Sequence, residues 1–306
     1  MSSSTALLPK DNKKGDHPIF LRVCHSPWLG VGQKALVGLR GLVAAYLVAS
    51  FIMIIDYEIK HNHHGWLTVF EFSNLQYFIQ VLYHVIAFTW TYMHLHYPHH
   101  GSQTQSAATR VQKFLSPPRQ HTSTKNKTWF GIYYSATNSF PYTSLLIHWA
   151  ILVPKNKTTI PADQIFNNGW FTTFFVLNKF GISALVGFIE VLFFSSIRIP
   201  EATHSDSPIH HPLTCFQTIG AHTAGLTVLS FIYIGWTYIG YIVQDKFAYY
   251  FFDHKQVGWE YVISSWFGFA VLNNLFFWFI YGLTAIRQQL TKKGENKKSG
   301  YQQLPQ

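Results

Sequence analysis

One long apolar stretch, from Trp66 to His100, constrains the fold more than any other part of the chain. It is too long and too apolar for an ordinary soluble helix, and its length suits a membrane crossing. Its middle carries a polar stripe, at successive spacings of 3, 4 and 4 residues, formed by Ser73, Gln76, Gln80 and His84. At about 100° per residue these side chains share one helical face. Because hydrocarbon offers no hydrogen-bond partners, we expect that face to lie inside a helix bundle.

The composition of the whole chain favours the same class of protein. Of the 306 residues, 48% are apolar and only 12% are charged, whereas soluble domains have roughly a quarter charged residues. The formal net charge is +10. The basic residues flank apolar segments, so anionic lipid headgroups explain this charge better than nucleic acid does. The two cysteines, Cys24 and Cys215, are too few for a disulfide framework and make no C-x-x-C pattern.

Apolar segments alternate with polar loops along the chain, and we expect about six of them to span the membrane. The expected spans are approximately residues 35–55, 66–96, 129–153, 170–195, 216–243 and 261–286. The predicted fold is therefore all-α, a polytopic transmembrane helical bundle. A cytosolic tail at 1–34 precedes the helical domain at 35–287, and a disordered cytosolic tail follows at 288–306.

The charges of the loops predict the orientation. Both tails and the loop at 97–127 are rich in lysine and arginine, whereas the alternate loops hold most of the acidic residues between spans. The positive-inside rule then places both termini in the cytosol. We expect the membrane to be that of the endoplasmic reticulum or the plasma membrane. Arg40, near the start of the first span, is expected to extend to the nearby interface. Glu58 falls in the loop after that span.

Several polar and ionisable residues lie inside the expected spans. Charge in lipid is costly, so such residues should face inward and pair with one another. The expected polar interior consists of Gln76, Gln80, His84, Lys179, Glu190, Asn273 and Asn274. Lys179, Asn273 and Asn274 are candidate partners for the stripe at 76–84. Two interpretations stay open: these groups hold the helices together, or they line a pocket for a lipid headgroup or a proton path.

A second constellation lies near the outer ends of the second and third spans. Thr68 precedes Glu71 by three residues, and His148 is expected at a similar depth. A hydroxyl, an imidazole and a carboxylate can form a nucleophile with its base. The catalytic hypothesis makes Thr68 the nucleophile and His148 the base, with Glu71 orienting the imidazole. The alternative is that Thr68 caps a helix or packs as an ordinary hydroxyl.

Three histidine clusters raise the possibility of a di-iron lipid oxidase, because imidazole is a suitable ligand for iron. They are HNHH at 61–64, HLHYPHH at 94–100 and HSDSPIHH at 204–211. By the expected topology the first cluster lies on the opposite side of the membrane from the other two, so they cannot share one metal centre. We therefore predict no metal and no other cofactor.

Three stretches carry a resemblance to a known family: GWLTVFEFSNLQYFIQVLYH, YYSATNSFPYTSLLIHWAIL and LNKFGISALVGFIEVLF. They resemble the six-pass membrane proteins that include androgen-induced-gene-one-like and rolling-stone-like proteins, over most of residues 28–287. The first branch implies hydrolysis of lipid esters of hydroxy fatty acids by a threonine in the second span and a histidine in the fourth. Thr68 matches the threonine, but the histidine position falls near Lys179 and Phe180, where this chain has no histidine. The second branch implies no enzyme chemistry.

Three functions therefore stay open for a multi-pass integral membrane protein. The first is a lipid-ester hydrolase that acts in the bilayer, the second a non-enzymatic adaptor or transporter, and the third the di-iron oxidase. Membrane lipids are the expected partners, and one of them is the substrate if the chain is a hydrolase. Nucleic acid is not expected, and the sequence indicates no particular protein partner.

Overall fold

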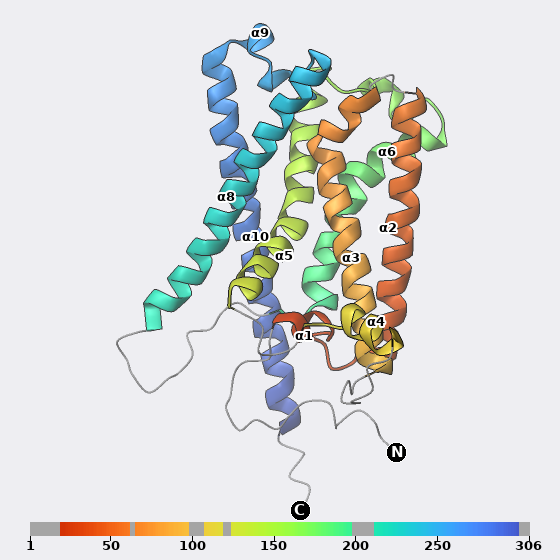
Figure 1. Cartoon of the computed structure of the whole chain (residues 1–306), viewed down its shortest axis with the longest axis vertical. Coiled ribbons are helices and arrows are strands. Elements are labelled where there is room, and N and C mark those ends of the chain that lie inside the picture. The colour runs from red at the N-terminus through yellow and green to blue at the C-terminus, as the bar shows by residue number, and fades with distance from the viewer. Residues whose placement is uncertain (1–18, 62–64, 98–106, 119–123, 198–210, 300–306) are drawn as a thin grey trace, which may run out of the picture.

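The computed structural model describes residues 19–61, 65–97, 107–118, 124–197 and 211–299, and within these ranges every regular element is helical. This confirms the all-α prediction. The long helical segments pack side by side as one bundle (Figure 1). They are α2 (Gln33–His61), α3 (Phe72–His96), α5 (Thr124–Leu146), the segment Trp170–Phe194, α8 (His211–Gln244) and α10 (Trp259–Ser299).

Shorter elements connect or cover these segments. The helices are α1 (Ile19–Val23), α4 (Ala107–Leu115) and α9 (His254–Val257), and the 3₁₀ turns are Gly65–Phe70, Ala162–Gln164 and Tyr250–Phe252. Two of the long segments contain wider π-helical turns. One π turn, Ile147–Leu152, extends α5. Two more, Asn178–Ile182 and Glu190–Phe194, follow α6 (Trp170–Leu177) and α7 (Ser183–Ile189).

Within the described ranges, four helical segments are long and apolar enough to cross a membrane. They are Gln33–Lys60, Trp170–Phe194, Ile219–Gln244 and Trp259–Thr291. The chain is therefore of the multi-pass membrane type. Helices α3 and α5 have 25 and 23 residues, which is enough to span, but neither contains a stretch as apolar as those of the other four segments. That both also cross the bilayer, giving six spans, stays a prediction.

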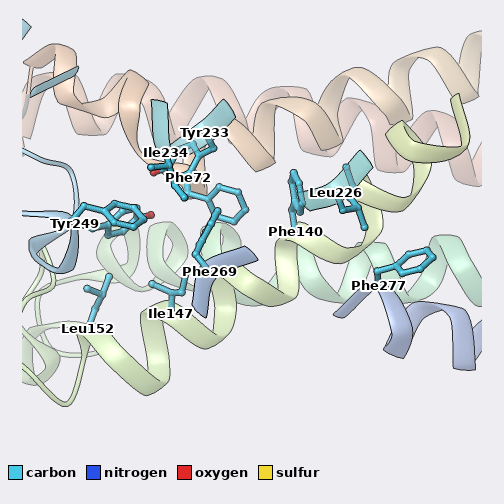
Figure 2. Close-up of a cluster of buried hydrophobic side chains, with 12 residues drawn as sticks. Phe72, Phe140, Ile147, Leu152, Leu226, Tyr233, Ile234, Tyr249, Phe269 and Phe277 are labelled. Atoms are coloured by element: carbon cyan, nitrogen blue, oxygen red, sulfur yellow. The ribbon is translucent and has the colours of Figure 1, made fainter. Parts of the chain in front are cut away.

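Aromatic side chains from four of the helices pack against one another near the start of α3 (Figure 2). The ring of Phe72 lies 5.2 Å from Phe140 of α5, 5.0 Å from Tyr233 of α8 and 4.9 Å from Phe269 of α10, between ring centroids. Offset and edge-on aromatic pairs of this kind add to the stabilisation from buried area. This cluster fixes the position at which α3 begins.

Glycine lets α8 approach its neighbours closely. A Cβ atom at Gly240 would lie 2.6 Å from the ring of Phe70, and one at Gly225 would lie 2.6 Å from Ile132. Neither position has room for a larger residue. Small residues at such crossings allow membrane helices to pack backbone against side chain.

The ends of several elements differ from the prediction. Helix α2 continues past Ile55 to His61, which brings Glu58 into the bundle, so its assignment to a loop was wrong. The stretch from Trp66 is not one helix, because a 3₁₀ turn ends at Phe70 and Glu71 is extended (φ −73°, ψ 130°) before α3 begins.

The predicted tails also differ from the structure in their described parts. Helix α1 lies inside the predicted tail 1–34, and it packs against the bundle with Phe20 and Val23 buried. At the other end, α10 continues past residue 287 to Ser299. The domain boundaries themselves stay predictions.

Candidate functional site

Lys179 lies at the centre of a buried cluster of charges. Its Nζ donates to Glu71 Oε2 at 2.6 Å and also to Glu58 Oε1. The side chains of Lys179 and Glu58 are only 2% and 4% exposed, and that of Glu71 is 15% exposed. The three groups come from the π turn at 178–182, from α2 and from the residue that precedes α3. The cluster therefore joins three separate parts of the bundle.

Local structure explains how each group reaches the cluster. Glu58 follows Leu47, Ser50 and Ile54 along the inward face of α2, at spacings typical of a helix, and all four are buried. Lys179 sits in a wide π turn, a distortion that occurs frequently at functional sites. Glu71 lies in the extended break between the 3₁₀ turn and α3, and from there its carboxylate reaches Lys179.

Neighbouring side chains of α3 stabilise the two carboxylates. Asn74 Nδ2 donates to Glu58 Oε2 at 2.6 Å and to the carbonyl oxygen of Thr68 at 2.8 Å. Ser73 Oγ donates to Glu71 Oε2 at 3.2 Å. Two carboxylates facing one ammonium leave one formal negative charge, and these donors lower the cost of burying it.

Thr68 lines a large apolar cavity between α2 and α3. Its volume is about 470 Å³, and its walls are formed by Phe51, Ile55, Ile59, Gly65, Thr68, Val69, Asn74, Leu75 and Phe78. Several of these side chains are exposed on the outside of the bundle, among them Ile59 and Val69. The Thr68 hydroxyl is buried and makes no hydrogen bond within the described part of the chain. Thr68 thus lines an apolar cavity while its hydroxyl has no hydrogen bond in the described structure.

His148 lines a different, smaller cavity of about 40 Å³, whose walls also include Glu71, Lys179 and Tyr249. The imidazole stacks on the ring of Phe180, with centroids 3.7 Å apart and planes 9° apart. Its Nε2 has no hydrogen-bond partner in the described residues. Burial raises the pKa of the Tyr249 phenol, and the neighbouring Glu71 carboxylate raises it further, so this hydroxyl is neutral.

Of the three predicted catalytic residues, Glu71 and His148 line one cavity and Thr68 lines another. Glu71 and His148 share the small cavity, although the Glu71 carboxylate bonds Lys179 and Ser73 rather than the imidazole in the described contacts. Thr68 lines the other cavity and connects to Glu71 through Asn74, whose Nδ2 lies 3.5 Å from Glu71 Oε2. The catalytic roles of Thr68, His148 and Glu71 stay predictions.

A second buried ion pair lies further along the Trp170–Phe194 segment. Arg40 Nη2 is 3.0 Å from Glu190 Oε1, and the Tyr83 hydroxyl donates to the same oxygen at 2.7 Å. Arg40 is only 1% exposed and also donates to the carbonyl oxygen of Val23. The expectation that Arg40 extends to the membrane interface was wrong, because Glu190 offers it a partner inside the bundle.

The polar stripe of α3 lies between these two clusters. Gln76, Gln80 and His84 are each at most 2% exposed, and Gln80 Nε2 donates to the carbonyl oxygen of Ser183. Asn273 and Asn274 do not bond to this stripe in the described contacts. Asn273 bonds Thr143 of α5 and Ser230 of α8, and Asn274 bonds Thr227 of α8. These asparagines therefore connect the other side of the bundle.

Sequence reasoning missed Glu58, Asn74 and Tyr83. Glu58 could have been found by extending the inward spacing of Leu47 and Ile54 beyond the end of the apolar run. Much of the three histidine clusters lies outside the described residues. Within the described ranges, histidine, cysteine and carboxylate side chains make no group of three that could hold a metal ion.

Comparisons with protein-family models, with curated proteins and with solved structures find no match to this chain. In the described structure the residues of the site offer a buried ion cluster with one excess negative charge, a threonine with an unbonded hydroxyl beside an apolar cavity, and a histidine with an unbonded Nε2 beside a more polar cavity.

Proposed function

We propose that this chain is a multi-pass membrane enzyme that binds a lipid in the cavity between α2 and α3 and hydrolyses an ester bond of that lipid. The supporting observation is Thr68, which lines a cavity of about 470 Å³ and whose buried hydroxyl makes no hydrogen bond in the described structure. An acyl chain suits the apolar walls, and ligand sites commonly combine such walls with a few polar groups.

In the proposed reaction Thr68 Oγ attacks the ester carbonyl, and the acyl group is transferred to Thr68. The hydroxyl proton passes through a base to the departing alcohol, and water then releases the fatty acid. His148 is the proposed base and Glu71 the proposed orienting group. A base must come within about 3 Å of the hydroxyl, which requires Thr68 and His148 to move closer when substrate binds. Asn74 donates hydrogen bonds to the backbone of Thr68 and to Glu58, and so links Thr68 to the charge cluster around Lys179.

The resemblance to androgen-induced-gene-one-like proteins supports the same chemistry through Thr68. Lys179 stands near the position at which that family has its histidine. In this chain Lys179 is held by two carboxylates and has no free pair of electrons, so the base must be another residue. This is a second reason to propose His148.

Hydrolysis of a fatty-acid ester of a hydroxy fatty acid, by protein purified in detergent, tests the proposal. We expect Thr68→Ala to lower turnover at least about 100-fold, and Thr68→Ser to keep measurable activity, because a hydroxyl remains. His148→Ala should be similarly impaired. The matched control is Thr91→Ala, because Thr91 is also a buried threonine but lies on α3, where its hydroxyl donates to the carbonyl oxygen of Ala87. Equal activity of wild type, Thr68→Ala and His148→Ala would remove these residues from the mechanism.

The second candidate function is a non-enzymatic membrane protein, an adaptor or a transporter. Thr68 and His148 line separate cavities, and Lys179 already has two partners, as expected of groups that hold helices together. A fluorophosphonate-type probe distinguishes the two candidates. Labelling that depends on Thr68 supports the enzyme, and absence of both labelling and hydrolysis favours the non-enzymatic protein.

We also propose that both termini face the cytosol, in the endoplasmic reticulum or the plasma membrane, on the basis of the loop charges. Single cysteines at two exposed positions test the orientation in intact cells. Leu29 precedes α2, and Phe166 precedes α6. For a protein at the plasma membrane, an impermeant reagent should label Phe166→Cys but not Leu29→Cys, and the reverse pattern contradicts the orientation.

A further inference from the structure

Buried polar atoms without partners gather along the stripe of α3. In the described structure no hydrogen bond reaches either polar atom of the Gln76 amide, Oε1 of Gln80, Nε2 of His84 or Oδ1 of Asn138 on α5. All four side chains are at most 2% exposed. An unpaired buried polar group is costly, and native proteins usually satisfy such groups with ordered water.

These groups lie along a continuous run of contacts between the two charged clusters. Ser183 Oγ donates to the carbonyl oxygen of Lys179 at 2.9 Å, and Gln80 Nε2 donates to the carbonyl oxygen of Ser183 at 2.8 Å. His84 Nδ1 lies 2.9 Å from the carbonyl oxygen of Gln80. His84 adjoins Tyr83, whose hydroxyl bonds Glu190. At 1.5 Å per residue, Lys179 and Glu190 are about 16 Å apart along their segment.

We propose that the bundle interior binds a file of water molecules along Gln76, Gln80 and His84, which joins the Lys179 cluster to the Arg40–Glu190 pair. The free donors and acceptors of these side chains supply the two to four partners that a buried water needs. Glu190 Oε2 is also without a hydrogen bond in the described structure, so the file has an acceptor at its far end. At its near end, Glu71 and Lys179 line the polar cavity that contains His148.

Such a file would give the protein a second activity. Chains of buried Asp, Glu and His side chains serve as proton relays in membrane pumps and transporters, and a file of water would connect such groups here. Here the relay would run from Glu71 and Glu58, beside Lys179, to Glu190, beside Arg40 and Tyr83. The proposed relay shares Glu71 with the proposed hydrolase but uses neither Thr68 nor the apolar cavity, so the bound water can be tested without reference to ester hydrolysis.

Radiolytic footprinting tests for the bound water directly. A short X-ray pulse turns water into hydroxyl radicals, which modify the nearest side chains, and mass spectrometry identifies the modified residues. We expect Tyr83, which has no exposed surface, to be modified at least several-fold more than Phe277, a comparably buried aromatic residue of α10 that lies away from the stripe. Equal modification of Tyr83 and Phe277 would overturn the proposal.

A pair of substitutions shows whether the stripe holds the water. In Gln76→Met/Gln80→Met, side chains of similar size without strong polar groups replace the amides, and modification of Tyr83 should fall to the level of Phe277. The control is Gln256→Met, at an exposed position of α9, which should leave Tyr83 modified as in wild type. Gel filtration and circular dichroism select folded protein for the comparison. Undiminished modification of Tyr83 in the folded double variant would refute the assignment to this stripe.

Discussion

Replacing Lys179 by methionine tests the energetics of the buried charge cluster. Methionine keeps most of the volume and apolar length of lysine and removes the charge. Glu58 and Glu71 would then face each other without their cation, and Asn74 and Ser73 would remain as their hydrogen-bond donors. We expect a large loss of stability with little change in packing.

The magnitude follows from the burial of the three side chains. Removing one partner of a buried ion pair costs about 3–5 kcal/mol, because the remaining charge is uncompensated. Here two carboxylates are left. Glu58 has 4% of its side chain exposed and Glu71 has 15%, so water can relieve part of the cost only at Glu71. We therefore expect Lys179→Met to lower the free energy of unfolding by about 3–5 kcal/mol.

Thermal unfolding of the purified protein in detergent measures this loss. At roughly 2–4 °C per kcal/mol, the midpoint should fall by on the order of 10 °C. Lys60→Met is the matched control. Lys60 pairs with Asp56 one turn away on α2, and both side chains are more than half exposed, so its loss should cost at most about 0.5 kcal/mol. Adding Glu58→Gln to Lys179→Met should recover part of the stability. Equal midpoints for Lys179→Met and Lys60→Met would refute the reasoning.

Two further predictions concern a buried thiol and a close helix contact. Burial raises the pKa of the Cys24 thiol to about 12, so at pH 8 only about one molecule in ten thousand carries the reactive thiolate. Maleimide should therefore label Cys24 slowly in native protein and rapidly after denaturation. Labelling of native Cys24 as fast as that of a cysteine placed at exposed Leu29 would contradict this. Gly240→Ala should destabilise the protein by about 1–3 kcal/mol, because its new methyl group would overlap the ring of Phe70. Gly235→Ala is the control on the same helix. Its methyl group meets no atom within 4 Å, so this variant should be neutral or slightly stabilising. Equal unfolding midpoints for the two glycine variants would show that the contact with Phe70 is not tight.

The helical class and the inward stripe of α3 could be predicted because both depend on local spacing. Polar groups at 76, 80 and 84 recur with the period of an α-helix, and hydrocarbon excludes them from the outer surface. The same reasoning failed for Glu58, because the apolar run ends at Ile55 and hydropathy alone ends the helix there. Lys179 needs a carboxylate, however, and Glu58 lies one turn beyond Ile54 on the buried face.

The break before α3 could not be predicted from the sequence. Between Trp66 and Phe72 the sequence contains no proline or glycine, so nothing local indicates that the helix begins only at Phe72. The structure places the break where tertiary contacts favour it, with Phe72 held by aromatic rings from three other helices and Glu71 turned toward Lys179. The expected neighbours Thr68 and Glu71 are consequently not on one helical face, which separates Thr68 from His148.

The two buried ion pairs together determine the register of α2 against the Trp170–Phe194 segment. Arg40 and Glu58 both lie on α2 and are about 27 Å apart along its axis, whereas their partners Glu190 and Lys179 are about 16 Å apart on the other segment. The long side chains span the difference, and the order of the pairs requires the two segments to be antiparallel. Sliding α2 by one turn, about 5.4 Å, would break both pairs at once and leave Arg40, Glu58 and Glu190 without their ionic partners, whereas Lys179 would keep Glu71. Apolar packing against lipid or helix gives little preference between such registers, so we infer that these charges specify the arrangement that also brings Glu58, Glu71 and Asn74 together beside Thr68.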